Sequence, residues 1–576
     1  MVATHTDPVT TEIIRNAFIA IADDMNAALI RSAYTPVIYE GKDCSVALLD
    51  ADGNVLGQSA GLPIFLGNLE ICVKLTAELF GWDVFKPGDV WLMNDSYMTG
   101  THLHDATIYA PIFWQGERVG FSCTRAHWHD VGGKDPGGST DSTSIYQEGI
   151  RFPPTKIYEN GEPRHDIHEL IKRNVRFGYG TIGDMNAQVA ACRTGEQRVQ
   201  QLLERFGYET ILAARDSIFA QSEVLERETV RHIPDGTYTA EGFLDNDGIR
   251  DEPVAVRLRI DVEGEQMTMN LDGSSPTTRG PVNCGFAQTV SACRVAFKML
   301  INPERPVDGG TFKTLHVTAP EGSIFYASEP AACEWYFTPL GLLIDLIVKA
   351  LAPVMPQQAA GAHYGDSMVI HYAGDDPRHD GRPFLGGEPN PGGWGAYHNG
   401  DGQDGLINTV NGGFKDIPVE ILETKYPMML RRYGLRTDTG GPGRFRGGCG
   451  VYREYHLEAD TVVYLWLERS VTPGWGLFGG GDAVGPDVVI NPGTDSEQHL
   501  LKANALELGD GDVILLQTGG GGGYGPPHER EVDRVRRDVL DGYVSLDMAR
   551  QIYGVVLRDD LSVDDAATRQ LRESMQ

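Results

Sequence analysis

Two histidine-rich motifs bracket a predicted β-hairpin, and this arrangement constrains how the chain can fold around them. The motifs are GTHLHD (Gly100–Asp105) and RAHWHD (Arg125–Asp130). The segment between them, Ala106–Ala126, has the pattern of two strands joined by the turn WQGER. Because the strands of a hairpin run antiparallel, we expect the two motifs to lie close together without any long-range contact.

The two motifs together carry the side chains of a metal site. Each contains one His-x-x-Asp tetrad and one further histidine. The candidate donors are, in chain order, His102, His104, Asp105, His127, His129 and Asp130. Mixed imidazole and carboxylate donors suit a divalent ion such as zinc, manganese or iron(II). Such an ion, with open coordination positions, could activate water or bicarbonate or polarise a carbonyl group.

One ion cannot bind all six side chains. Alternation along extended backbone would send His102 and His104 to one side, and the same holds for His127 and His129. Asp43, which precedes a predicted strand, is a further candidate ligand. Members that do not bind the ion could orient its ligands or act as general bases.

Three other features near or beyond the motifs are candidates for function. Glu148 is either a catalytic acid or base, or a solvated or salt-bridged glutamate. Arg125 could hold a carboxylate or phosphate through two parallel hydrogen bonds, or could only offset the local negative charge. The glycine run within Thr518–Pro527 lacks the P-loop ending, so close packing or a tight turn is favoured over an anion site. The chain therefore shows no recognisable ATP site.

Charge and cysteine content exclude several classes of function. The net charge of −31 argues against binding nucleic acid or anionic membrane, which require basic surfaces. Eight cysteines without a CxxC pair indicate reduced thiols. The N-terminal sequence does not resemble a signal peptide, and the apolar run Pro339–Pro353 is too short to span a bilayer. We therefore expect a cytoplasmic protein.

The length of 576 residues requires more than one hydrophobic core. Helical periodicity is predicted over 8–31, 68–80, 184–206 and 215–232, and β-type segments begin after residue 234. These patterns predict a multi-domain α+β (mixed α/β) fold with antiparallel, β-rich central and C-terminal parts. The expected domains are an α/β domain with the metal site (1–232), a central β-rich domain with helices (233–415) and a glycine-rich β domain with a closing helix (416–576).

Long stretches of the chain resemble the hydantoinase B/oxoprolinase family, over about residues 10–560. They include NDSYMTGTHLHDATIYAP, GFSCTRAHWHDVGG, SIYQEGIRFPP, QVAACRTGEQR, LDGSSPTTRGPVN and GGPGRFRGGCGVYREY. The resemblance implies a subunit that carries a divalent metal, often manganese or zinc. It also implies a hydantoinase A-type partner with an actin-like fold, which binds ATP and phosphorylates the substrate. By motif position, the implied metal ligands are Asp43, His102, Asp105 and His127, with His104, His129 and Asp130 around them.

The family resemblance implies one of two reactions on a small molecule. One opens a cyclic amide such as a hydantoin, 5-oxoproline or a lactam, and the other carboxylates a ketone such as acetone or acetophenone with bicarbonate. We expect the first, in a hetero-oligomer, with the ketone carboxylase subunit as the alternative. Glu148, Arg125 and His129 are the candidate catalytic residues. A non-catalytic scaffold for the ATPase and a stand-alone metallohydrolase are further alternatives.

One departure from the family pattern concerns the substrate. The sequence before the PVE motif reads LINTVNGGFKDIPVE, whereas many hydantoinase-like members carry a histidine and a Thr/Asn series there. The segment Cys333–Phe337 is a candidate lining of an unusual pocket. The identity of the substrate therefore stays open at the level of the sequence.

Overall fold

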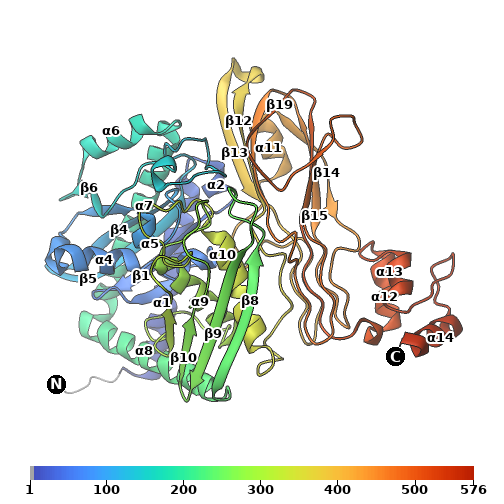
Figure 1. The fold of residues 1–576 in the computed structure, drawn as a ribbon. Helices are drawn as coiled ribbons and strands as arrows, with labels where there is room; N and C mark the ends of the chain where they lie inside the picture. Colours follow the sequence, from blue (N-terminus) through green and yellow to red (C-terminus); the bar gives the residue numbers. More distant parts are fainter. Residues whose placement is uncertain (1–5, 576) are drawn as a thin grey trace. The chain divides into compact units, whose positions relative to one another are not determined.

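The computed structural model of the protein describes residues 6–575, which form two compact units. Unit 1 consists of the chain up to Thr237, Arg259–Tyr336 and Val410–Ile417; unit 2 consists of Tyr238–Leu258, Phe337–Thr409 and the chain from Pro418 onward. The fold is mixed and multi-domain, as the sequence predicted (Figure 1). The division into three contiguous domains stays a prediction. Within the described residues, no helix combines the length and apolar character needed to cross a bilayer.

Unit 1 is built on a seven-stranded antiparallel sheet with the strand order β2-β1-β5-β4-β3-β6-β7. Its strands are β1 (Cys44–Asp50), β2 (Val55–Gln58), β3 (Val90–Met93), β4 (Asp105–Trp114), β5 (Glu117–His127), β6 (Thr155–Glu159) and β7 (Glu162–Pro163). Every residue of β1 is buried, which means that both faces of the sheet are covered. Val46 and Leu48 pack into one hydrophobic cluster, and Ala47 and Leu49 pack into another.

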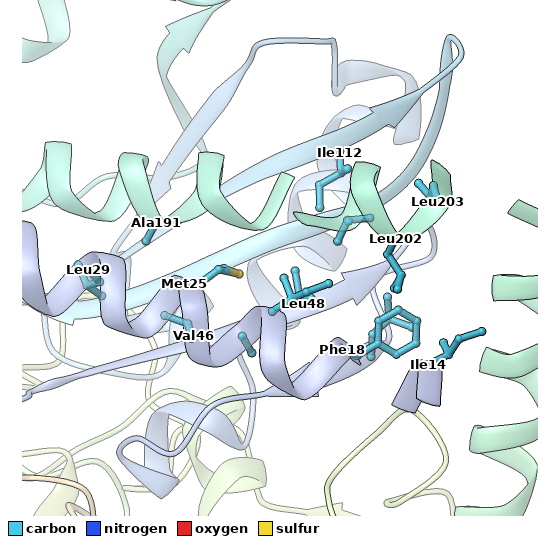
Figure 2. Packing of buried hydrophobic residues seen from close by; sticks show 14 of the residues in the cluster. Ile14, Phe18, Met25, Leu29, Val46, Leu48, Ile112, Ala191, Leu202 and Leu203 are labelled. Atoms are coloured by element: carbon cyan, nitrogen blue, oxygen red, sulfur yellow. The ribbon is translucent and has the colours of Figure 1, made fainter. Parts of the chain in front are cut away.

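The helix predicted over 8–31 is confirmed as α1 (Pro8–Ser32). It begins at Pro8 because the carboxylate of Asp7 accepts hydrogen bonds from the amides of Val9 and Thr10, both at 3.0 Å. Its apolar stripe packs with α7 (Gly178–Phe206) against one face of the sheet (Figure 2). The opposite face is covered by α4 (Ile71–Phe80).

The other elements of unit 1 complete its core. The remaining helices are α2 (Pro36–Tyr39), α3 (Pro63–Leu66), α5 (Ser96–Thr99), α6 (His165–Asn174), α8 (Tyr208–Arg231) and α9 (Phe286–Leu300). Strand β10 (Gln266–Asn270) pairs antiparallel with the second half of β9 (Val254–Glu263) and parallel with β11 (Leu315–Thr318). The β10–β11 pair is therefore an exception to the antiparallel pairing expected of the central part.

Unit 2 contains two antiparallel sheets, with the orders β13-β12-β16-β19 and β14-β15-β20-β17-β18. Their strands are β12 (Val369–Asp376), β13 (Arg382–Pro389), β14 (Met428–Leu435), β15 (Val451–Leu457), β16 (Thr461–Trp466), β17 (Asp487–Ile490), β18 (Gln498–His499), β19 (Lys502–Leu508) and β20 (Val513–Gln517). Unit 2 also includes most of β8 (Gly236–Leu244) and the helices α10 (Phe337–Leu351), α11 (Val419–Lys425), α12 (Val532–Leu540), α13 (Leu546–Gln551) and α14 (Asp565–Met575).

The glycine run in unit 2 packs backbone against backbone with other glycine-rich segments. The amide of Gly521 donates to the carbonyl oxygen of Gly448 at 3.0 Å, and that of Gly523 donates to Gly481 at the same distance. A Cβ atom on Gly521 would lie 2.1 Å from the carbonyl carbon of Trp394. These N–H groups are committed to the protein backbone, so close packing, rather than anion binding, explains the run.

Candidate metal centre

The β4–β5 hairpin brings the two histidine-rich motifs together, as the sequence predicted. Asp105 is the first residue of β4, and it pairs directly with His127, the last residue of β5. The neighbouring strand β1 begins one residue after Asp43, and the amide of His127 donates to the carbonyl oxygen of Asp43 at 3.1 Å. The ends of three adjacent strands therefore place these three side-chain positions at one edge of the site.

A tight turn before β4 supplies the remaining imidazoles. Gly100 has a φ of +87°, and a Cβ atom there would lie 2.4 Å from the amide nitrogen of Gln288, so only glycine fits. The carbonyl oxygen of His102 accepts from the amide of Asp105 at 3.2 Å, and that of His104 accepts from Ala106 at 3.0 Å. The ring centroids of His102 and His104 lie 5.3 Å apart.

One group of donors among the described residues has the spacing of a metal site: His102, Asp105 and His127. One ligand atom from each lies within 4.8 Å of the other two. The Nε2 atom of His102 lies 2.9 Å from Asp105 Oδ1, and the Nδ1 atom of His127 lies 3.4 Å from the same oxygen. Two donors bound to one ion at about 2.1 Å stand roughly 3.4 Å apart in tetrahedral geometry, so these separations fit a single divalent ion.

Asp43 is outside that group of three, but its state also fits a nearby cation. Its carboxylate is buried, and its Oδ1 atom has no hydrogen-bond partner among the described residues. Burial, and then repulsion from Asp105, raise the pKa of Asp43 well above its ordinary value. A buried carboxylate oxygen without a donor is costly unless a positive charge approaches it.

The segment after residue 330 adds two groups whose roles the sequence did not reveal. The Oε1 atom of Glu334 lies 3.3 Å from His102 Nδ1 and 3.7 Å from His104 Nε2, while its buried Oε2 atom has no hydrogen-bond partner among the described residues. The hydroxyl of Tyr336 donates to Asp105 Oδ2 at 2.8 Å. Both lie within the candidate pocket segment Cys333–Phe337, which was the only signal for them in the sequence.

The charges of these buried groups depend on one another. Burial favours a neutral Asp105, but the imidazoles of His102 and His127 outweigh it and hold the pKa of Asp105 below its usual value. Burial would lower the pKa of His102, yet Asp105 and Glu334 raise it well above the ordinary value. Burial lowers the pKa of His104 to about 4, so this ring is neutral at pH 7.

Glu148 is buried against the same segment rather than solvated. Its carboxylate accepts from the amides of Cys333 at 2.9 Å and Glu334 at 3.0 Å, and from Ser142 Oγ at 2.7 Å. Burial, and then repulsion from Glu334, raise the pKa of Glu148 to about 8. Gly138 makes room for this arrangement, since a Cβ atom there would lie 2.4 Å from Glu334 Oε1. Glu148 therefore positions Glu334, and its role in catalysis stays a prediction.

Arg125 is fully buried and already bound to protein groups. Its Nε atom donates to Thr107 Oγ1 at 2.7 Å, its Nη1 atom to Asn68 Oδ1 at 2.9 Å, and its Nη2 atom to Cys72 Sγ at 3.8 Å. Its guanidinium therefore ties β4 and β5 to the segment before α4. The proposed clamp on a substrate anion stays a prediction.

His129 and Asp130 are not members of the three-donor group. The ring of His129 stacks on Phe177 with centroids 5.9 Å apart. Asp130 accepts from the amide of Arg176 at 2.5 Å and from its guanidinium at 2.8 Å. The carboxylate of Asp130 is therefore bound by Arg176. The catalytic assignment of His129 stays a prediction.

The chain matches known proteins over almost its whole length. It is 31% identical over 585 residues to a protein from Pseudomonas sp. (strain NS671) that is named as the B-type subunit of a putative D-/L-hydantoinase, covering 98% of each chain. It is 29% identical over 585 residues to the beta chain of caprolactamase from Pseudomonas jessenii, again covering 98% of each. A 5-oxoprolinase from Dictyostelium discoideum is 28% identical over 91% of this chain and 41% of its own length.

Solved structures and a family profile agree with these relatives. The ATP-dependent caprolactamase from Pseudomonas jessenii superposes with a TM-score of 0.90 at 28% identity, over 99% of this chain and 100% of that chain. Nucleotide-free acetone carboxylase shares the fold, with a TM-score of 0.88 at 20% identity. The sequence profile of hydantoinase B/oxoprolinase matches residues 7–527. The chain therefore belongs to the hydantoinase B/oxoprolinase family of enzymes.

Proposed function

We propose that this chain is the metal-bearing subunit of an ATP-dependent cyclic-amide hydrolase. The observation that carries the proposal is the buried group His102, Asp105 and His127, in a chain that aligns end to end with a hydantoinase subunit and a caprolactamase subunit. The substrate class is a hydantoin, 5-oxoproline or a lactam.

The three donors, together with the buried carboxylate of Asp43, would hold a manganese, zinc or iron ion. When bound, a divalent ion polarises a carbonyl oxygen or activates water for attack. The hydrogen bond from Tyr336 to Asp105 Oδ2 orients the carboxylate of Asp105, so that its Oδ1 atom faces the histidines of the donor group.

His104 and Glu334 lie beside the donors, where they would orient a water molecule, although their lowered pKa values make both weak bases at pH 7. His104 is neutral, and its Nδ1 atom lies 2.8 Å from the carbonyl oxygen of Trp128, which can only accept a hydrogen bond. The proton of the ring is therefore on Nδ1, and Nε2 is a free base that faces Glu334 Oε1 at 3.7 Å. Glu148 fixes the backbone of Glu334 in this position.

ATP would be bound by a second chain of the hydantoinase A type, which phosphorylates the substrate in a hetero-oligomer. Two relatives are themselves named as subunits, and this chain lacks a P-loop. All eight cysteines are buried and free, which supports a reducing, cytoplasmic location.

The test is substrate-dependent ATP hydrolysis by the complex co-purified with its ATPase partner and metal. Hydantoins and lactams are compared with ketones in the presence of labelled bicarbonate. Amide-dependent turnover without fixation of label supports the proposal, whereas label in a β-keto acid makes the chain a ketone carboxylase subunit. Turnover without ATP or the partner would instead identify a stand-alone metallohydrolase. Full activity of a metal-free complex would show that the chain is a non-catalytic scaffold for the ATPase.

A further inference from the structure

A second group of buried reactive side chains lies in unit 2 and shares no residue with the metal centre. The Nδ1 atom of His363 lies 2.7 Å from Asp345 Oδ1, and its Nε2 atom lies 3.3 Å from Thr409 Oγ1. All three side chains are buried. The order hydroxyl, imidazole, carboxylate is the arrangement that activates an alcohol as a nucleophile.

The hydrogen bonds fix the tautomer of the imidazole. The ionised carboxylate of Asp345 can only accept, so Nδ1 of His363 carries the proton and Nε2 presents its lone pair. The hydroxyl of Thr409 therefore donates to Nε2. The guanidinium of Arg469 donates from Nη1 to the other carboxylate oxygen of Asp345 at 3.1 Å. This hydrogen bond holds the carboxylate in its orientation toward His363.

The backbone of Arg469 has an energetically unfavourable conformation. Its backbone has a φ of +69°, and the facing Gly365 has a φ of +99°. A Cβ atom on Gly365 would lie 2.5 Å from Arg469 Cγ, so a larger residue would displace the guanidinium. A left-handed backbone is unfavourable for a residue other than glycine, and such strain is concentrated at functional sites.

The same guanidinium carries an unused donor. Arg469 Nη2 is buried and has no hydrogen-bond partner among the described residues, although the guanidinium lies over the ring of Trp475 at 4.8 Å. A buried N–H without an acceptor is unfavourable, and more so when it is charged. Arg469 contacts the relay at Asp345, on the other side of His363 from Thr409, so its guanidinium supports the base rather than the reacting oxygen.

We propose that Thr409, His363 and Asp345 form a second reactive site that accepts acyl groups from small activated esters and acyl phosphates, with Arg469 holding the carboxylate of Asp345 in place. This activity goes beyond the proposed ring opening at the metal centre and uses none of its residues. Three of these side chains supply the nucleophile, the base and the group that orients the base, and Arg469 fixes the last of these.

The reaction balances with the groups present. The Thr409 Oγ atom attacks the carbonyl carbon while its proton passes to His363 Nε2. The tetrahedral intermediate then expels the alcohol or phosphate, and an alcohol leaves with the proton from Nε2. Water attacks the acyl-threonine ester with His363 as the base again, which releases the carboxylic acid and restores the hydroxyl.

The test uses the full-length chain with p-nitrophenyl acetate and, separately, with a fluorophosphonate. We expect a burst of nitrophenol and one acetyl or phosphonyl group per chain, which peptide mass mapping assigns to Thr409. The label is expected to persist in the His102→Ala variant and after removal of metal, because the site contains no metal ligand. A folded wild-type chain that takes up no label, or takes it up elsewhere, overturns the proposal.

Variants separate a reactive relay from a structural hydrogen-bond network. Thr409→Ser should keep the label, Thr409→Val should lose it, and His363→Gln should slow acylation by about 100-fold or more, because it removes the general base. Thr439→Val is the matched control, since it deletes another buried hydroxyl of unit 2 and should leave labelling unchanged. Equal labelling rates in His363→Gln and wild type would also overturn the proposal. Circular dichroism verifies that each variant is folded. If a variant does not fold, peptide mass mapping of the labelled wild-type chain is the deciding measurement for the proposed site.

Discussion

Asp105 and His127 are paired residues of one hairpin, and a single carboxylate oxygen of Asp105 lies within 3.4 Å of His127 and 2.9 Å of His102. The other oxygen of that carboxylate is held by Tyr336. The geometry makes Asp105 the central donor of the group, since its Oδ1 atom is shared by both imidazoles. Loss of this carboxylate should therefore affect metal binding more than loss of any residue around it.

We expect Asp105→Asn and His127→Ala each to weaken metal affinity by at least about tenfold and to abolish turnover of the complex. The measurement is metal content by mass spectrometry after dialysis against a graded chelator, alongside the thermal unfolding temperature. His129→Ala is the matched control from the same motif, and it should retain the metal. Retention of stoichiometric metal and activity by His127→Ala would refute the assignment of the site.

Arg125→Met should lower the free energy of unfolding by about 2–4 kcal/mol, because it leaves the buried acceptors of Thr107 and Asn68 without their donor. Urea denaturation of the variant measures the effect. Arg173→Met removes an exposed arginine with a surface ion pair and should change stability by less than about 1 kcal/mol. A variant of Arg125 that keeps its stability but shows a raised KM would instead support the substrate clamp.

Local sequence patterns were sufficient to predict the hairpin and the proximity of its two motifs. The strands were expected over Ala106–Ala126, and the structure has them at Asp105–Trp114 and Glu117–His127. Two mainly apolar runs on either side of a short polar turn indicate such a hairpin without help from the rest of the chain. The register that pairs Asp105 with His127 also depends on an irregularity between Ile112 and Phe113, which the turn length alone does not predict.

The contributions of Glu334 and Tyr336 could not be predicted in the same way. Tyr336 is separated from Asp105 by 231 positions, and no periodicity in the sequence links such distant segments. The same holds for the glycine run, where the sequence indicated close packing but not its partners. The segments that meet Gly521, which include Gly448 and Trp394, are short and lack hydrophobic periodicity.

Gly521→Ala should destabilise unit 2 by at least about 3 kcal/mol, since the new Cβ atom would stand 2.1 Å from the backbone of Trp394 and no flexible side chain can move aside. Thermal unfolding and the yield of soluble protein measure the effect. The control is Gly509→Ala, where the nearest atoms would be 3.8 Å away and little change is expected. Equal stability of the two variants would contradict this backbone packing.

Asp366 should make stability fall as the pH rises. Burial, and then repulsion from Glu468, raise the pKa of Asp366 to about 7, whereas in the unfolded chain it is about 4. Between these values the native state holds a proton that the unfolded state has released, so the free energy of unfolding decreases with pH and levels off above about 7.

Asp366→Asn should remove this dependence and flatten the change in unfolding free energy between about pH 5 and pH 8 by on the order of 2 kcal/mol. Urea denaturation at both pH values measures it, with the exposed residue of the same region, Asp375, changed to Asn as the control. A pH profile of Asp366→Asn that parallels wild type would show that this carboxyl is ionised throughout the range.

The position of the donors in the chain has a consequence for the order in which the site is assembled. His102, Asp105 and His127 belong to one hairpin with its preceding turn, and such short-range structure closes early because little chain entropy is lost. During synthesis the three donors emerge together, long before Glu334 and Tyr336 are made. An ion captured at that stage would be present while the rest of unit 1 folds, and the segment with Glu334 and Tyr336 would close over it last.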